Sequence, residues 1–301
     1  MTATPNTPAL RCALPGQDLL GETPLWCTRT QSLLWLDIDG GRVQRLHPAS
    51  GRHDVFAFAD RYVGSLALLR EPGRVLLAIE LGLYTFDFAT GEQRLLCQVE
   101  PLENDNRLND GRCDAQGRFW VGTMDNQLHR PNGALYRIDT DGSAHRMFGE
   151  VIVTNTIALS PDQGTLYFSD TRRYTTWQFT VDADGALTDR RIFVDHTGSK
   201  SRPDGACVDS QGYVWNAIFG GARIERYTPA GQLDRVIDLP VTNPTCVCLG
   251  GPDLKTLYIT TARKFLNRAQ LRNEPLAGSV LAIDVDVPGL PEHCFGAPTS
   301  G

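Results

Sequence analysis

The sequence predicts an all-β fold, a six-bladed β-propeller, on the strength of three observations. A short apolar run follows a turn six times along the 301 residues. The large residues aligned within it are Trp35, Leu77, Trp120, Tyr167, Trp215 and Tyr258, so that successive gaps are 42, 43, 47, 48 and 43 residues. Such a period is typical of propeller blades. A second strand pattern follows each run, and no long segment has the 3.6-residue period of a helix.

The second strand of most units alternates apolar and polar residues, as in GALYRIDT and ARIERYTP. Asp-Gly pairs at 141–142 and 184–185 are strong hairpin signals. The one segment predicted to be helical is 261–271, an insertion in the last unit. That unit ends near residue 287, and the leading segment ALRCAL (residues 9–14) is expected to complete its sheet and close the ring. No linker interrupts the units, so residues 1–301 are predicted to form a single domain.

Charge and composition argue against several classes of partner. The formal net charge is −6 and no Lys/Arg block exists, so nucleic acid and anionic membranes are not expected as partners. No apolar run approaches the ~18 residues of a membrane span. The amino-terminal stretch lacks the features of a signal peptide, so a cytoplasmic location is expected. The eight cysteines include no CxxC pair, and we expect them to be reduced.

Polar side chains recur where the innermost strands of the predicted blades begin. Counting back eight or nine residues from the turn glycine of three units gives Asn109, Asn155 and Asp204. The first and last units offer Glu22 and Asn243 at similar places. Because the inner strands of a propeller line its central channel, we expect these side chains to meet around one mouth.

Converging carboxylates repel one another and are poorly solvated in a channel unless a cation accompanies them. Carboxylate and amide oxygens are ligands for hard divalent cations. The set therefore predicts one divalent ion in the channel, with Ca²⁺, Mg²⁺, Mn²⁺, Zn²⁺ and Fe²⁺ all open. The alternative interpretation is that each Asn or Asp merely starts a strand or caps a turn.

Other catalytic motifs are missing from the sequence. None of the six histidines has a paired zinc spacing. His129, just after GTMDN, could overhang the mouth of the channel, although a surface position is favoured. No GxSxG elbow, P-loop or GxGxxG occurs, so a Ser or Cys nucleophile has no support.

The segments LGETPLW, RLNDGRCDAQGRFWVGTM, GALYRID, TNTIALSPDQGTLYFSD and PDGACVDSQGYVW resemble motifs of the gluconolactonase/regucalcin (senescence marker protein) family, in that family's order and across almost the whole chain. The tail GGPDLKTLYITTARK is similar to bacterial aldonolactonases of pentose catabolism, including xylonolactonase-like members. The resemblance implies a six-bladed propeller that holds one divalent metal in its channel. It implies Glu22, Asn155 and Asp204 as metal ligands, Asn109 as a residue beside the metal that also meets substrate, and Arg107 as a substrate-contacting arginine.

Two positions depart from the family pattern. Thr156 stands where the family usually has Gly, and Asn126 stands where the animal lactonases carry a substrate-contacting Glu. The metal-binding set is intact, so the resemblance implies an altered sugar preference rather than a lost activity. Asn126 and Arg107 are then expected to hold substrate hydroxyls.

The expected activity is hydrolysis of a sugar lactone to the aldonic acid, in pentose or hexose catabolism. The metal would polarise the ring ester, and Asp204 would act as the catalytic base toward water. An alternative is that the metal activates the water and Asp204 only positions it. Two rival functions remain open, namely metal-dependent hydrolysis of phosphoester or fluorophosphate substrates and a non-enzymatic calcium-binding propeller.

The expected substrate is a small-molecule pentonolactone or hexonolactone without phosphate. The reason is that Arg107 is the single cation that the sequence places near the mouth, whereas a phosphate site favours a Lys/Arg cluster. The protein is expected to be a monomer or a weak homo-oligomer.

Overall fold

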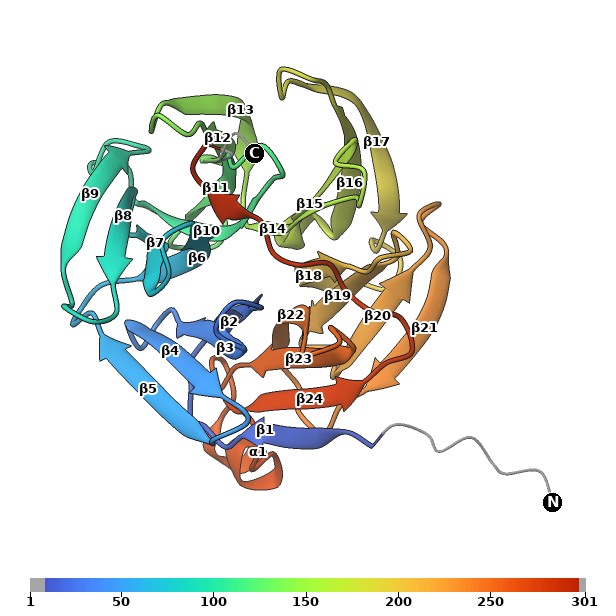
Figure 1. Ribbon diagram of the computed structural model, residues 1–301. Coiled ribbons are helices and arrows are strands. Elements are labelled where there is room, and N and C mark those ends of the chain that lie inside the picture. The colour runs from blue at the N-terminus through green and yellow to red at the C-terminus, as the bar shows by residue number, and fades with distance from the viewer. Residues whose placement is uncertain (1–8, 298–301) are drawn as a thin grey trace.

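Six antiparallel sheets surround a central axis in the computed structural model, which describes residues 9–297 (Figure 1). The prediction of a six-bladed propeller is confirmed. Blades one to three consist of β2 (Gly21–Cys27), β3 (Ser32–Asp37), β4 (Arg42–His47) and β5 (Arg52–Ala57); β6 (Val63–Leu69), β7 (Arg74–Ile79), β8 (Gly82–Asp87) and β9 (Gln93–Gln98); and β10 (Asn106–Cys113), β11 (Phe119–Asp125), β12 (Gly133–Ile138) and β13 (Ala144–Val151).

The fourth and fifth blades follow the same four-stranded plan, and the sixth takes its outer strand from the amino-terminal end. These blades consist of β14 (Thr154–Leu159), β15 (Thr165–Asp170), β16 (Thr175–Val181) and β17 (Leu187–Asp195); β18 (Arg202–Val208), β19 (Val214–Phe219), β20 (Arg223–Tyr227) and β21 (Leu233–Asp238); and β22 (Pro244–Gly250), β23 (Thr256–Thr261), β24 (Val280–Asp284) and β1 (Arg11–Leu14). The pairing of β1 with β24, Arg11 opposite Ala282, confirms that the segment 9–14 closes the ring.

The periodic large residues lie on the second strand of each blade, and the three tryptophans among them each make the same kind of buried contact. Trp35, Trp120 and Trp215 are at most 1% exposed. Their indole nitrogens donate to the carboxylates of Asp18, Asp114 and Asp209, at 2.9, 2.9 and 3.0 Å. A large buried ring therefore has its one polar atom satisfied, which removes the cost of burying an unpaired donor.

The prediction of a helix over residues 261–271 is mostly wrong. Thr261 is the last residue of β23, and the following backbone N–H groups of Arg263 and Lys264 donate to the carbonyls of Asp18 and Leu19. A helix, α1, covers only Arg268–Asn273. It begins there because Asn267 caps its first turn in a reciprocal capping box with Gln270. A 3-10 turn, η1 (Thr171–Arg173), follows β15.

The carboxy-terminal segment extends beyond the sixth unit in a way that the repeat pattern did not predict. After β24 the chain crosses the middle of the ring (red in Figure 1), and β25 (Cys294–Phe295) pairs in parallel with β6. Residues 290–293 lie against the far ends of four inner strands, beside Arg112, Leu159, Val208 and Leu249. The segment therefore covers the end of the channel opposite to the starts of the inner strands.

Glu292→Gln is expected to lower the free energy of unfolding by about 2–3 kcal/mol. The Arg112 guanidinium lies 2.6 Å from the Glu292 carboxylate, and both side chains are under a fifth exposed. The substitution leaves a largely buried cation without its counter-charge, and urea unfolding measures the loss. Glu92→Gln removes the partner of Arg94 in a well-exposed pair and is expected to change stability by less than about 1 kcal/mol. Equal losses of stability in the two variants would contradict the inference that the buried Arg112–Glu292 pair stabilises the fold.

Two further features concern the cysteines and the helices that the structure describes. All eight cysteines are free thiols, and burial raises the pKa of several of them, including Cys113, Cys246 and Cys248. Within residues 9–297, no helix is long and apolar enough to cross a bilayer.

Candidate metal and substrate site

The inner strands are irregular where they begin. In all six of them the pairing register with the second strand shifts close to the strand start. The shift follows Glu22 in β2 and Asn155 in β14, and the next residues, Thr23 and Thr156, have φ of 45° and 54°. Such bulges redirect side chains that a regular strand would point into the sheet. Polar residues at these positions can therefore face the channel.

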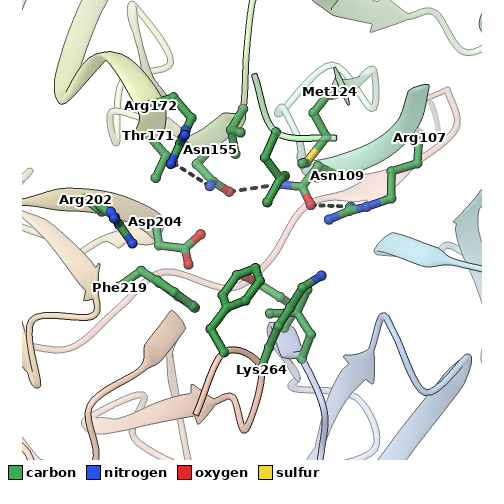
Figure 2. Close-up of a pocket in the computed structure, with 15 residues that line it drawn as sticks. Arg107, Asn109, Met124, Asn155, Thr171, Arg172, Arg202, Asp204, Phe219 and Lys264 are labelled. Carbon is green, nitrogen blue, oxygen red and sulfur yellow. Dashed lines mark hydrogen bonds between the residues drawn. The ribbon is translucent and has the colours of Figure 1, made fainter. Parts of the chain in front are cut away.

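One cavity of about 600 Å³, partly open to solvent, lies at the mouth of the channel where the inner strands begin (Figure 2). Its floor is buried and carries five of the residues predicted from the sequence, namely Glu22, Arg107, Asn109, Asn155 and Asp204. Its rim is exposed or half-buried and consists of Leu128, Arg172, Arg202, Phe219, Lys264 and Phe265. Met124, Val153 and Leu20 add buried apolar surface.

Two residues that the sequence placed near this mouth lie outside the cavity lining. Asn126 is half-buried, and its amide nitrogen lies 3.4 Å from a carboxylate oxygen of Asp105. The expected contact between Asn126 and substrate therefore has no support from its position. The amide of Asn243 donates to the carbonyl of Lys264 at 2.9 Å and so fixes the loop after β23.

A chain of hydrogen bonds crosses the floor (Figure 2) and sets the orientation of each amide. Arg107 donates to the side-chain oxygen of Asn109 at 2.5 Å, and Asn109 donates to the side-chain oxygen of Asn155 at 3.0 Å. Asn155 in turn donates to the Thr171 hydroxyl at 2.8 Å. With its nitrogen held by Thr171, Asn155 directs its oxygen to Asn109, and the second lone pair of that oxygen remains for a ligand.

Thr156, which stands where the family usually has Gly, takes part in positioning Asp204. Its hydroxyl donates to the backbone carbonyl of Asp204 at 2.5 Å and accepts from the Asn216 amide at 3.0 Å. The same Asn216 nitrogen lies 2.9 Å from the Asp204 carbonyl. A β-branched residue in the left-handed region is strained, and these hydrogen bonds offset the strain at Thr156. They also fix the backbone of β18 at Asp204, the candidate base.

The carboxylates of the floor have strongly raised pKa values. Burial, and then the neighbouring Asp110, raise the pKa of Glu22 to about 8, although Arg107 opposes the shift. Burial and the Glu22 carboxylate raise the pKa of Asp204 well above its usual range, and burial also raises the pKa of Asp110. Three buried acids thus lie close enough to repel, and a bound cation would remove that repulsion.

These residues fit a hard divalent cation. The carboxylates of Glu22 and Asp204 and the amide oxygen of Asn155 form a donor set that such ions accept. In residues 9–297 no group of three or more His, Cys, Asp and Glu side chains is arranged to hold a metal. The fit therefore depends on the amide oxygen of Asn155 as the third ligand, beside Glu22 and Asp204.

The rim residues were missed by sequence reasoning. Arg202 lies two positions before Asp204 in the same strand, a spacing that places both side chains on one face, so this signal was available. Arg172 and Lys264 lie on connections after second strands, outside the repeated pattern. The premise that Arg107 is the single cation near the mouth is therefore wrong, because three more cationic side chains line the cavity.

The fold and the sequence together show the family to which the chain belongs. The sequence profile of the SMP-30/gluconolactonase/LRE-like region matches residues 20–263, and the chain belongs to this family.

Individual relatives agree with the assignment. The chain is 40% identical over 289 residues to a 6-deoxy-6-sulfogluconolactonase of Pseudomonas putida, covering 95% of this chain and 98% of that one. It is 32% identical to an L-arabinolactonase of Azospirillum brasilense, with 95% of each chain covered. Among solved structures, a calcium-binding protein, regucalcin, of Agrobacterium tumefaciens superimposes with a TM-score of 0.91 at 31% identity, covering 96% of this chain and 98% of that one.

Proposed function

We propose that this protein is a metal-dependent sugar lactonase that opens an aldonolactone to the aldonic acid. The observation that carries the proposal is the convergence of Glu22, Asn155 and Asp204 on one buried floor beside Arg107 and Asn109. The names of two relatives, a sulfogluconolactonase and an arabinolactonase, support the same reaction. The lactone would arise from oxidation of an aldose at its anomeric carbon, which places the step in pentose or hexose catabolism.

Glu22, Asn155 and Asp204 would hold the ion, with water completing its shell. When bound, the dication supplies Lewis-acid polarisation of the ring ester carbonyl and stabilises the negative charge that develops on its oxygen. Since Glu22 and Asp204 have raised pKa values without metal, binding displaces protons from them, and metal affinity is expected to rise with pH.

Residues of the chain carry out the proton transfer and bind the substrate. Asp204 accepts a proton from the water whose oxygen bonds to the carbonyl carbon. The bond from that carbon to the ring oxygen then breaks, and Asp204 returns the proton to the ring oxygen, which becomes a hydroxyl group. Arg107 donates hydrogen bonds toward sugar hydroxyls or the ester. The amide nitrogen of Asn109 already donates to Asn155 and to the Thr154 carbonyl, so Asn109 accepts from a sugar hydroxyl through its oxygen. Apolar side chains such as Met124 and Phe219 cover the sugar face and limit water.

A second candidate is a calcium-binding role without catalysis, which the name of the regucalcin structure favours. Turnover separates the two. Purified protein stripped of metal with a chelator is assayed on xylono-, arabinono-, galactono- and gluconolactone, with each divalent metal restored in turn. A phosphotriester serves as the probe for the rival hydrolase activity.

We expect at least one lactone to be hydrolysed well above its spontaneous rate, and the activity to be lost with chelator and regained with metal. Calcium binding without turnover of any lactone would favour the second candidate. Turnover of the phosphotriester alone would favour the rival hydrolase.

A further inference from the structure

The rim of the cavity carries positive charge that an uncharged sugar lactone does not require. We propose that Arg172 and Arg202 form an anion-binding site, and that the substrate is a sugar lactone bearing a strongly acidic group at the end of the sugar remote from the ester. This inference rests on the proposed lactonase function and deepens it. The acidic group is a sulfonate, phosphate or carboxylate, which share the oxygens that guanidinium groups bind.

The two arginines come from neighbouring blades and lie on the same side of the cavity. Arg172 is in η1, directly after Thr171, whose hydroxyl contacts both Asn155 and the carbonyl of Pro203. Arg202 begins β18, two residues before Asp204. Figure 2 shows both side chains on the side of Asp204, with Arg107 on the opposite side. An anion between them would thus be next to the candidate base but outside the buried floor.

Among the residues that the structure describes, neither of these arginines forms an ion pair, whereas their neighbours do. Arg173 pairs with Asp170 at 3.4 Å, and Arg223 pairs with Glu225 at 2.7 Å. Lys264, on the same rim, pairs with Asp39 at 2.8 Å. On the rim of the cavity, a carboxylate therefore neutralises Lys264, whereas no described carboxylate pairs with Arg172 or Arg202.

The charge balance of the cavity points the same way. Four cationic side chains line it against two carboxylates, Glu22 and Asp204, which leaves a surplus of two positive charges before any metal is added. With Asp39, which pairs with Lys264, and the buried Asp110 beside Glu22 also counted, the charges balance. A divalent ion on the floor would add two positive charges, so the metal-loaded cavity would attract anions.

The carboxylate of the aldonate product does not explain why Arg172 and Arg202 lie at the rim. That carboxylate forms at the carbonyl carbon, which must lie on the floor beside Asp204, a residue only 6% exposed. Arg172 is exposed and Arg202 half-buried. An anion held by both therefore belongs to another part of the sugar.

The test compares kcat/KM for matched lactones. Gluconolactone and galactonolactone are assayed as they are and with a sulfonate, phosphate or carboxylate at carbon 6. We expect the wild-type protein to prefer at least one anionic series, and increasing salt to weaken that preference. Arg172→Gln and Arg202→Gln are each expected to reduce the ratio of anionic to neutral kcat/KM by about 10-fold.

Arg173→Gln is the matched control, because Arg173 is adjacent in sequence, carries the same charge and does not line the cavity. It is expected to leave the ratio unchanged. The series with the largest ratio identifies the acidic group. A wild-type preference for the neutral lactones, or equal ratios in Arg202→Gln and Arg173→Gln, would overturn the proposal.

A binding measurement keeps this proposal separate from the lactonase assignment. The ring-opened aldonates with an acidic group at carbon 6 are titrated into the protein by calorimetry, which needs no turnover. Tighter binding than that of the unsubstituted aldonate, lost in Arg172→Gln and Arg202→Gln, would support the anion site even if no lactone were hydrolysed. Equal affinity for the two aldonates would overturn it even if neutral lactones were excellent substrates.

Discussion

Asp204→Asn is expected to lower kcat for lactone hydrolysis by about 10²–10⁴-fold. Asp204 is a buried carboxylate of the cavity floor whose backbone is fixed by Thr156 and Asn216. Asparagine keeps the shape and one oxygen ligand, but it removes the charge and the ability to accept a proton from water. The variant should still fold, which circular dichroism and thermal unfolding can verify.

A metal titration of this variant decides the role of Asp204. If Asp204 is the base, saturating metal restores the bound ion but not the turnover. If it serves only as a ligand, excess metal rescues most of the activity, and the base must be sought elsewhere. Asp195→Asn, a change at an exposed position at the end of β17, is the control that should behave as wild type throughout.

Glu22→Gln is expected to weaken metal binding by at least about 100-fold, because it removes one of only two charged ligands. A metal bound by the folded state alone stabilises it, by about 2.7 kcal/mol at 100 times the dissociation constant. At that metal concentration the variant would gain less than about 0.5 kcal/mol. Calorimetric titration and the metal-dependent shift in Tm measure the two effects.

Without metal the same substitution is expected to act in the opposite direction at high pH. The folded pKa of Glu22, about 8, exceeds its ordinary value, so its contribution to stability is fully present at acidic pH and is lost as pH rises through 8. Chelated wild-type protein should therefore lose more stability between pH 6 and 9 than chelated Glu22→Gln. Parallel pH profiles of Tm for the two proteins would show that the pKa of Glu22 is not raised in the folded protein.

The sequence was informative where the structure repeats. Each blade places a large buried residue at an equivalent position of its second strand. These positions recur at nearly constant intervals along the chain, so the period was visible in the sequence. The floor residues Asn109, Asn155 and Asp204 could be aligned for the same reason, since equivalent positions on inner strands meet around one axis.

The features that sequence reasoning missed belong to single blades. Arg172 and Lys264 lie on the connections after β15 and β23, and the length of this connection differs from blade to blade, so no repeat revealed them. The helical segment was misplaced because backbone contacts of Arg263 and Lys264 with the first blade overrode a helical pattern. The carboxy-terminal segment reaches β6 by tertiary pairing with no local signature.

The closure of the ring by β1 has a consequence for biosynthesis. Arg11 lies opposite Ala282, so β1 pairs with a strand that the ribosome makes much later. At roughly 5–20 residues per second, the intervening chain takes about 14–54 seconds to make. Throughout that interval β1 has no partner, and the nascent chain carries an open strand edge that other chains can join. Blades one to five can form as they emerge, whereas the sixth must wait until β24 is made. Aggregation and chaperone engagement should therefore concentrate in this interval.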